Sequence, residues 1–376
     1  MKRLTKYWEY GVGCALAAAE RSWLPDWLLR AGIRRLCHQR LRQCDARDDS
    51  ANEAALQALL QESRRGPIAL LPELANEQHY ELPAEFFALM LGERRKYSCG
   101  LWQPEATNLD QAEDVALNAT CEHAQLEDGQ EILELGCGWG SLTLWMAARY
   151  PAARIVAVSN SHSQRRFIES ECRRLHLANV QVLTADINGF SPTRQFDRVV
   201  SVEMFEHVRN HSRLLQRIAG WLRPGGKLFV HIFCHRRFAY PFEQQGQQNW
   251  MGRHFFSGGM MPSRDWLDRH DDDLAVEQRW HWNGEHYRRT AESWLERLDA
   301  NRGQALAILR AAYGPGQADL WLQRWRMFLL AVAELFGFAG GTEWYVIHAL
   351  LAHQGAARKV ASTSLAGSLQ QEGCAP

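Results

Sequence analysis

The 376-residue chain has no excess of charge of either sign and no sign of a disulfide framework. Lysine and arginine together number 43, as do aspartate and glutamate, so the formal net charge is zero. Nothing in that balance favours nucleic acid as a partner. The nine cysteines are scattered, odd in number and include no Cys-x-x-Cys pair. This usage indicates free thiols in a reducing compartment, so we expect a cytoplasmic protein.

The sequence also lacks a membrane-spanning run and a metal-ligand pattern. The apolar run from Met327 to Phe338 is short and is interrupted by Glu334, whereas a helix across a bilayer needs about 20 apolar residues. His231, Cys234 and His235 lie close together, but no partner ligands stand elsewhere in the chain. We therefore predict no metal.

Tryptophan is abundant by contrast, with 15 residues, and its ring suits flat or greasy ligands and membrane interfaces. The stretch from Trp27 to Leu41 interleaves leucines with arginines, which predicts a basic amphipathic helix. Such a helix either contacts an anionic membrane or packs on the core with a solvated basic face, and we favour the second reading. The oligomeric state stays open, with a homodimer as one option.

One stretch organises the rest of the chain. Residues Glu131–Leu135 read as a short buried strand, Gly136, Gly138 and Gly140 follow at alternate positions, and Ser141–Tyr150 keeps helical spacing. This pattern predicts a strand, a glycine turn and a helix, in which a ligand can lie against bare backbone at the positive end of the helix. The spacing matches neither a phosphate-binding P-loop nor the dinucleotide fingerprint, because the third glycine comes one residue early.

Strands and helices alternate from Gly129 onward, which predicts a doubly wound α/β fold. We expect a mostly parallel, seven-stranded Rossmann-like sheet whose ligands bind at the carboxyl ends of the strands. The predicted strands are Glu131–Leu135, Arg154–Val158, Val180–Leu183, Phe196–Val202, Lys227–Phe233, Val276–Trp282 and Trp344–Leu350. The predicted regions are a helical N-terminal lid (1–95), a cofactor-binding core (96–235), a cap insertion with the last two strands (236–353) and a disordered tail (354–376).

The fourth predicted strand runs into Glu203, Glu206 and His207. Two carboxyl groups and an imidazole within five residues, just past a buried strand, suit proton transfer. Burial would push the two carboxyl pKa values apart, and histidine ordinarily titrates near neutrality. The alternative is a helix-capping cluster without chemistry.

Four short motifs occur in order along the chain: Tyr97-Ser98-Cys99, Gly136-Cys137-Gly138-Trp139-Gly140, Met204-Phe205-Glu206-His207 and Phe256-Ser257-Gly258-Gly259. Together they resemble the cyclopropane fatty acid synthase family of class I S-adenosylmethionine-dependent methyltransferases. Segments such as Phe229–His235 and Ala331–Gly337 are more similar to its small-molecule branch, the coclaurine-type N-methyltransferases. The resemblance covers about Trp27 to His353.

The resemblance implies S-adenosylmethionine as the cofactor, with S-adenosylhomocysteine as its product, and a set of residues that bind it. Many methyltransferases hold the ribose with an acidic residue after the second strand, whereas this family uses a hydroxyl and a glutamine there. For Ser159 alone, a helix N-cap is an equally good explanation. The implied cofactor residues are Tyr97, Ser98, Glu134, Gly136 and Gly138 at the methionine end, Ser159, Asn160 and Gln164 after the second strand, and Asp186 and Ile187 beside the adenine.

The resemblance also implies two alternative chemistries. In the N-methyltransferase branch, the residues matching Glu203 and His207 orient an amine and take its proton, with Glu206 holding His207 or the substrate cation. In the cyclopropane branch, a bicarbonate removes a proton from a methylated alkene. The residues that match its bicarbonate ligands are Cys99, Glu206, His231 and Tyr287.

Glu203 decides between the two chemistries, because lipid synthases usually have glycine at this place. A carboxylate is costly beside a bare alkyl chain and favourable beside a cationic amine. We therefore expect methylation of a small amine, cyclic or aromatic. The alternative is methylene transfer to an unsaturated phospholipid acyl chain.

Overall fold

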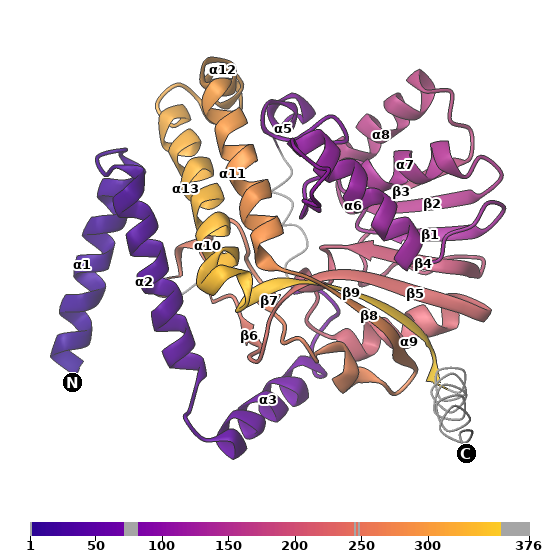
Figure 1. Cartoon of the computed structure of the whole chain (residues 1–376), viewed down its shortest axis with the longest axis horizontal. Helices are drawn as coiled ribbons and strands as arrows, with labels where there is room; N and C mark the ends of the chain where they lie inside the picture. The colour runs from indigo at the N-terminus through magenta and orange to yellow at the C-terminus, as the bar shows by residue number, and fades with distance from the viewer. Residues whose placement is uncertain (1, 71–81, 244–245, 247–248, 355–376) are drawn as a thin grey trace, which may run out of the picture.

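The computed structural model describes residues 2–70, 82–243, 246 and 249–354, with side chains from residue 11 onward. Across these residues the main sheet has seven strands in the order β3-β2-β1-β4-β5-β9-β8 (Figure 1). Strands β1 to β5 are parallel, and β9 runs antiparallel to both β5 and β8. The strands are β1 (Glu131–Leu135), β2 (Arg154–Ser159), β3 (Val180–Thr184), β4 (Phe196–Val202), β5 (Leu222–His235), β8 (Leu274–Trp282) and β9 (Trp344–His353).

The predicted fold class is confirmed, and the strand predictions agree closely with the observed bounds. Strands β1 and β4 have the bounds that the sequence predicts, and both are short runs of mostly apolar residues that end at a turn. The largest difference is β5, which begins at Leu222 instead of Lys227 and ends at His235. At its start, Leu222 pairs with Phe196 of β4, and at its end β9 continues to His235 and gives the last residues a hydrogen-bonding partner.

Helices cover both faces of the sheet. Cores of apolar side chains join α6, α7 and α8 to one face, while a separate core joins α9 to the other (Figure 1). Each face is thereby removed from water, as expected for parallel strands that are apolar on both sides. These helices are α6 (Leu109–His123), α7 (Ser141–Arg149), α8 (His162–Arg174) and α9 (His211–Trp221).

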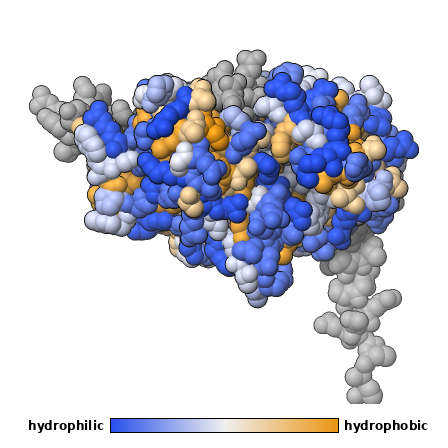
Figure 2. All heavy atoms as spheres, turned by 90° about the horizontal axis from the view of Figure 1, so that it is seen from above, coloured by the Kyte–Doolittle hydropathy of each residue, from blue (hydrophilic) through white to orange (hydrophobic). Residues whose placement is uncertain are grey.

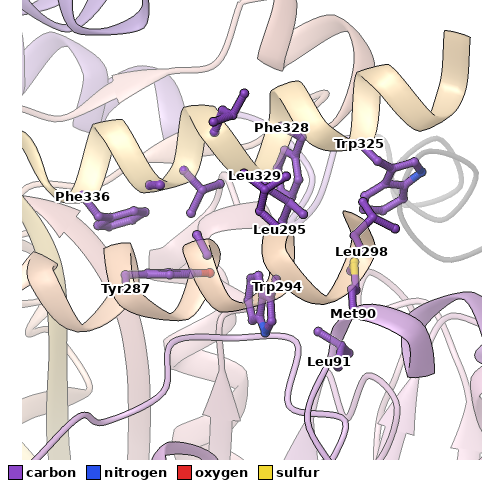
Figure 3. Packing of buried hydrophobic residues seen from close by; sticks show 14 of the residues in the cluster. Met90, Leu91, Tyr287, Trp294, Leu295, Leu298, Trp325, Phe328, Leu329 and Phe336 are labelled. Atoms are coloured by element: carbon purple, nitrogen blue, oxygen red, sulfur yellow. The ribbon is translucent and has the colours of Figure 1, made fainter. Parts of the chain in front are cut away.

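A second, helical layer stands beside the sheet. In it α11 and α13 pack side by side, and Figure 3 shows Tyr287 of α11 lying against Phe336 of α13 with their ring centroids 4.3 Å apart. The hairpin of α1 and α2 lies along α13, and α5 packs on α11. These helices are α1 (Lys2–Glu20), α2 (Asp26–Cys44), α5 (Ala84–Met90), α11 (Gly284–Ala300), α12 (Arg302–Tyr313) and α13 (Ala318–Phe336).

The remaining elements connect these two layers. Helix α3 (Asp49–Ser63) follows the hairpin, and the segment after β5 holds the short strands β6 (Tyr240–Pro241) and β7 (Met260–Met261) with α10 (Trp250–His254) between them. The predicted disordered tail lies outside the described residues, apart from Gln354. Among the described residues no helix is both long and apolar enough to cross a membrane. Figure 2 shows mostly hydrophilic side chains on one face, with hydrophobic patches between them.

Candidate active site

Two cavities meet at the carboxyl ends of β1, β2 and β4. The first is lined by the glycine turn after β1 and by residues that follow β2 and β4. The second has a volume of about 940 Å³ and lies between the sheet, the α1–α2 hairpin and α13. Tyr97, Glu203 and His207 line both cavities. A reaction between a group held in one cavity and a group held in the other would therefore take place beside these three side chains.

The glycine turn needs glycine for two separate reasons. Gly136, Gly138 and Gly140 all have φ between 51° and 80°, a left-handed conformation that side chains disfavour. In addition, a Cβ on Gly136 would lie 2.7 Å from the Cβ of Met204. The turn thus brings bare backbone against the segment that carries Glu203 and places it at the N-terminus of α7.

The first cavity contains buried polar groups that suit a polar ligand. Ser159 Oγ donates to Gln164 Oε1 at 2.6 Å, which orients the amide. Gln164 Nε2 and Ser141 Oγ are buried and have no hydrogen-bond partner among the described residues. Since unpaired buried donors are costly, a ligand that bonds to them would be stabilised. This wall is therefore suited to a polar cofactor such as S-adenosylmethionine.

Most of the residues predicted to bind the cofactor lie together around this first cavity. Asp186 is the exception, because its side chain is exposed and accepts hydrogen bonds from the backbone and side chain of Asn188. The neighbouring Ala185 and Ile187 line the cavity in its place. The predicted residues in the lining are Tyr97, Ser98, Glu134, Gly136, Gly138, Ser159, Asn160, Gln164 and Ile187.

Glu134 is a buried carboxyl group in the floor of the first cavity. It is 3% exposed, and its Oε2 accepts a hydrogen bond of 2.5 Å from Thr143 of α7. Burial raises its pKa to about 8, although the hydrogen bond from Thr143 acts in the opposite direction. Glu134 is therefore mostly protonated at neutral pH in the absence of a cationic neighbour.

Glu203 is held at the junction of the cavities by three donors. Its Oε1 accepts from the backbone N–H of Cys99 at 2.9 Å and lies 3.2 Å from His231 Nε2, while its Oε2 accepts from the Tyr287 hydroxyl at 2.6 Å. Burial alone would raise the pKa of Glu203. The hydrogen bond from His231 leads the effects that outweigh burial, so the pKa lies below its ordinary value. Glu203 is thus a half-buried carboxylate that stays charged.

Three of the four residues matched to bicarbonate ligands converge on this carboxylate. His231 and Tyr287 bind Glu203 with their side chains, and Cys99 does so with its backbone, since its thiol donates to the Gly100 carbonyl instead. The protein's own carboxylate is therefore placed among the donors that the resemblance assigns to bicarbonate.

Glu206 and His207 are both uncharged at neutral pH. Glu206 Oε1 accepts from the backbone N–H of Phe233 at 2.7 Å, and burial together with the charge of Glu203 raises its pKa well above the ordinary value. Burial lowers the pKa of His207 to about 4, and its ring stacks on Phe256 with centroids 5.2 Å apart. The expected separation of the two carboxyl pKa values is confirmed, with Glu203 as the ionised group.

Sequence reasoning missed other buried polar residues around Glu203. Lys96 is buried and donates from Nζ to Ser98 Oγ and to the Cys99 carbonyl, which fixes the segment that binds Glu203. His348 lies on the far side of His231, 2.8 Å from it. Lys96 directly precedes the Tyr-Ser-Cys motif, and a charged residue at that position could have indicated its role. His348 in the apolar strand β9 is by contrast typical of a core residue and gave no usable signal.

Comparisons with known proteins agree with this arrangement. A family model described as mycolic acid cyclopropane synthetase matches residues 72–339. The chain is 39% identical over 301 residues to (S)-coclaurine N-methyltransferase from Thalictrum flavum subsp. glaucum, covering 79% of this chain and 83% of that protein. It is 31% identical over 227 residues to cyclopropane-fatty-acyl-phospholipid synthase from Escherichia coli K12, covering 60% of this chain and 56% of that protein.

A solved structure of a coclaurine N-methyltransferase is also similar to this chain. The crystal structure of coclaurine N-methyltransferase bound to N-methylheliamine and SAH matches with a TM-score of 0.87 and 36% identity, covering 90% of this chain and 98% of that one. The fold and the cofactor cavity thus define a class I methyltransferase that uses S-adenosylmethionine. The chain belongs to the mycolic acid cyclopropane synthetase family, and its relatives include both N-methyltransferases and cyclopropane synthases.

Proposed function

We propose that this methyltransferase transfers the methyl group of S-adenosylmethionine to the nitrogen of a small amine on an apolar, ring-containing skeleton. The observation that carries the proposal is the ionised Glu203, which lines both cavities and is held by Cys99, His231 and Tyr287. A half-buried negative charge at this junction favours a cationic amine over an alkyl chain.

The second cavity supports the choice of skeleton. Aromatic residues line this cavity, among them Phe256, Phe233 of β5 and Trp294 of α11. Aromatic rings bind flat apolar bodies, and their faces also attract cations. A substrate with an apolar ring and one amino group would match both features, and the structural relative that carries N-methylheliamine is consistent with this choice.

The proposed mechanism assigns a separate task to each group. The bound cofactor supplies an electrophilic methyl group. Glu203 binds the ammonium form of the substrate and accepts its proton, because the nitrogen has no free lone pair until that proton leaves. His207, which is neutral, orients the nitrogen at the junction. Cofactor and substrate together displace water from the two cavities, so positioning in a dry site supplies much of the acceleration.

The lipid alternative has less support. The Escherichia coli relative acts on phospholipid by its name, and the large apolar cavity would admit an acyl chain. However, three residues matched to bicarbonate ligands are engaged with Glu203 in this chain. The carboxylate of Glu203 would repel a bicarbonate anion and would be costly beside an acyl chain.

A matched pair of isosteric variants tests the proposal. Glu203→Gln removes the charge that binds the ammonium, and we expect kcat for heliamine or coclaurine to fall by about 100-fold or more. Glu206→Gln imitates a group that is already protonated, so its kcat should fall far less. Calorimetry with S-adenosylhomocysteine shows whether each variant keeps its cofactor site. Equal losses in the two variants, or full activity in Glu203→Gln, would contradict the assignment.

A further inference from the structure

A row of three histidines leads away from Glu203. His231 Nε2 lies 3.2 Å from Glu203 Oε1, His231 Nδ1 lies 2.8 Å from His348 Nε2, and His348 Nδ1 lies 2.8 Å from His123 Nδ1. His231 and His348 are fully buried, whereas His123 is partly exposed. Every nitrogen between Glu203 and His123 thus has a neighbour at hydrogen-bond distance, and the row ends at a side chain that reaches solvent.

The sheet itself aligns this row. His231 in β5 and His348 in β9 are direct register partners, so their side chains lie on the same face of the sheet. That face is covered by α6, whose last residue is His123. Each histidine lies on a strand or helix that packs against the element carrying the next histidine. Regular secondary structure therefore positions the whole row.

Aromatic side chains enclose the row. The ring centroids of Trp282 and His348 are 4.1 Å apart, those of Phe229 and His348 are 4.8 Å apart, and His123 stacks on Trp280 at 4.0 Å. These rings shield the imidazole nitrogens from other hydrogen-bond partners. Burial also lowers the pKa of His231, His348 and His123, so all three imidazoles are neutral at physiological pH.

We propose that Glu203, His231, His348 and His123 form a proton relay that carries the proton of the substrate amine out of the closed active site to solvent. The proposal rests on the proposed amine methylation, because that reaction delivers a proton to Glu203 while cofactor and substrate occupy the two cavities that it lines. A neutral imidazole can accept a proton on one nitrogen and release one from the other, which is the property that a relay requires.

The transfer balances at every step. It starts from the primed tautomers, in which His231 carries its proton on Nδ1 and Nε2 does not donate to Glu203 as it does in the resting site. The amine proton passes to Glu203 and on to Nε2 of His231, while Nδ1 of His231 gives its proton to Nε2 of His348. Nδ1 of His348 gives its proton to Nδ1 of His123, and Nε2 of His123 releases one proton to water. One proton enters and one leaves, and each ring ends as its other neutral tautomer. The rings return to their first tautomers after product release, when His123 takes a proton from water and Glu203 gives one to water in the open cavity.

Two variants interrupt the relay at different depths. His123→Ala removes its outer end, and we expect kcat for heliamine to fall by about tenfold or more, with cofactor affinity unchanged. Imidazole in the buffer should restore the rate, because it can take the place of the deleted ring, whereas sodium chloride at the same concentration should not.

His348→Gln breaks the relay in the buried interior, where free imidazole has no access, so its rate should fall without rescue. His281→Phe alters an exposed histidine that packs on Tyr345 and serves as the matched control.

The outcomes separate this proposal from the proposed function. If the natural chain methylates no amine, the proposed function fails. If it does so and His123→Ala is equally fast, or is slow and not rescued by imidazole, the relay is contradicted. Nitrogen NMR of histidine-labelled protein adds a readout that is independent of activity. Couplings across the His231–His348 and His348–His123 hydrogen bonds support the relay, and their absence overturns it.

Discussion

At the scale of single residues, the site depends on which carboxyl group stays ionised and which becomes protonated. Glu206 is fully buried and Glu203 is half-buried, and three donors hold Glu203 as a carboxylate while burial and the neighbouring charge favour the protonated form of Glu206. Two like charges so close together would repel each other, and a single ionised carboxylate avoids that cost. The arrangement provides one negative charge for one cationic nitrogen.

Glu134 provides a prediction about cofactor binding. Its pKa of about 8 lies above the ordinary value, so the group is mostly protonated at pH 7 and ionises only as the pH rises through 8. If Glu134 lies beside the ammonium of the methionine end, the bound cation lowers this pKa and binding releases up to about one proton at pH 7. Calorimetry in buffers of different ionisation enthalpy measures this release. It should be smaller in Glu134→Gln and at pH 9, and a release that is identical in both proteins would contradict the role.

Single residues were only partly predictable from the sequence. The cluster of Glu203, Glu206 and His207 stood out because charged residues directly after a buried strand are unusual. Which of the carboxyl groups stays ionised was not predictable, because the donors to Glu203 come from segments about 100 residues before it and 84 residues after it. Their convergence depends on how α11 packs against the sheet.

At the scale of elements, the turn after β4 carries the carboxylate of Glu203, our proposed base, in a strained conformation. Glu203 has φ of 48°, a left-handed value that glycine adopts without cost and other residues do not. The family resemblance implies that lipid synthases usually have glycine here. The same backbone turn can therefore serve both branches, and the carboxylate is added at the expense of local strain.

Two variants at this turn isolate the strain. Both Glu203→Gly and Glu203→Ala remove the carboxylate and its three hydrogen bonds, so they differ mainly in backbone preference. Because alanine disfavours the left-handed conformation, we expect Glu203→Gly to be more stable than Glu203→Ala by about 1 kcal/mol. Urea unfolding of the two proteins gives the difference directly. An equal or lower stability of the glycine variant would show that the turn relaxes when the side chain is removed.

Elements were more predictable than residues. The alternation of apolar strands and amphipathic helices located every strand of the main sheet, since each has a local signal that its neighbours reinforce. Helix α12 was not predicted, because Gly303 lies in its first turn and the stretch has few large apolar residues. The short pair of β6 and β7 was also missed, since two-residue strands form only through the tertiary contact that pairs them.

At the scale of the whole molecule, the N-terminal hairpin closes the second cavity by packing on the helical layer. Arg30 of α2 reaches Glu292 of α11 at 2.6 Å and Glu334 of α13 at 3.0 Å. The two contacts to Glu292 form a bidentate pair, which fixes orientation as well as distance. The hairpin is thus attached to both long helices that form the wall of the cavity.

Removing this attachment should weaken binding of the amine and leave binding of the cofactor unchanged. Arg30→Gln loosens the wall of the second cavity, and we expect KM for heliamine to rise by about tenfold, equivalent to about 1.4 kcal/mol. The dissociation constant of S-adenosylhomocysteine should stay the same, because the first cavity is lined by other segments. Arg42→Gln, an exposed position on the same helix, is the control. An equal effect on both ligands would show that the hairpin contributes to overall stability and has no specific role in the amine cavity.

The large-scale organisation was predictable only in outline. The sequence indicated helices before and after the sheet, and the basic amphipathic helix corresponds to α2. Its arginines include Arg30 and Arg34, which form ion pairs with acidic residues of the helical layer. This agrees with the core-packed reading of that helix. Contact with a membrane and the oligomeric state stay open predictions.

Intact transfer of the methyl group to nitrogen can be followed through the deuterium that the group carries. The protein is given S-adenosylmethionine with a fully deuterated methyl group, together with heliamine and with vesicles of unsaturated phospholipid, and the products are weighed by mass spectrometry. We expect a water-soluble amine that has gained a methyl group with all of its deuterium. A lipid product that has lost one deuterium, with no labelled amine, would contradict it, because a cyclopropane forms only when a proton leaves the transferred carbon.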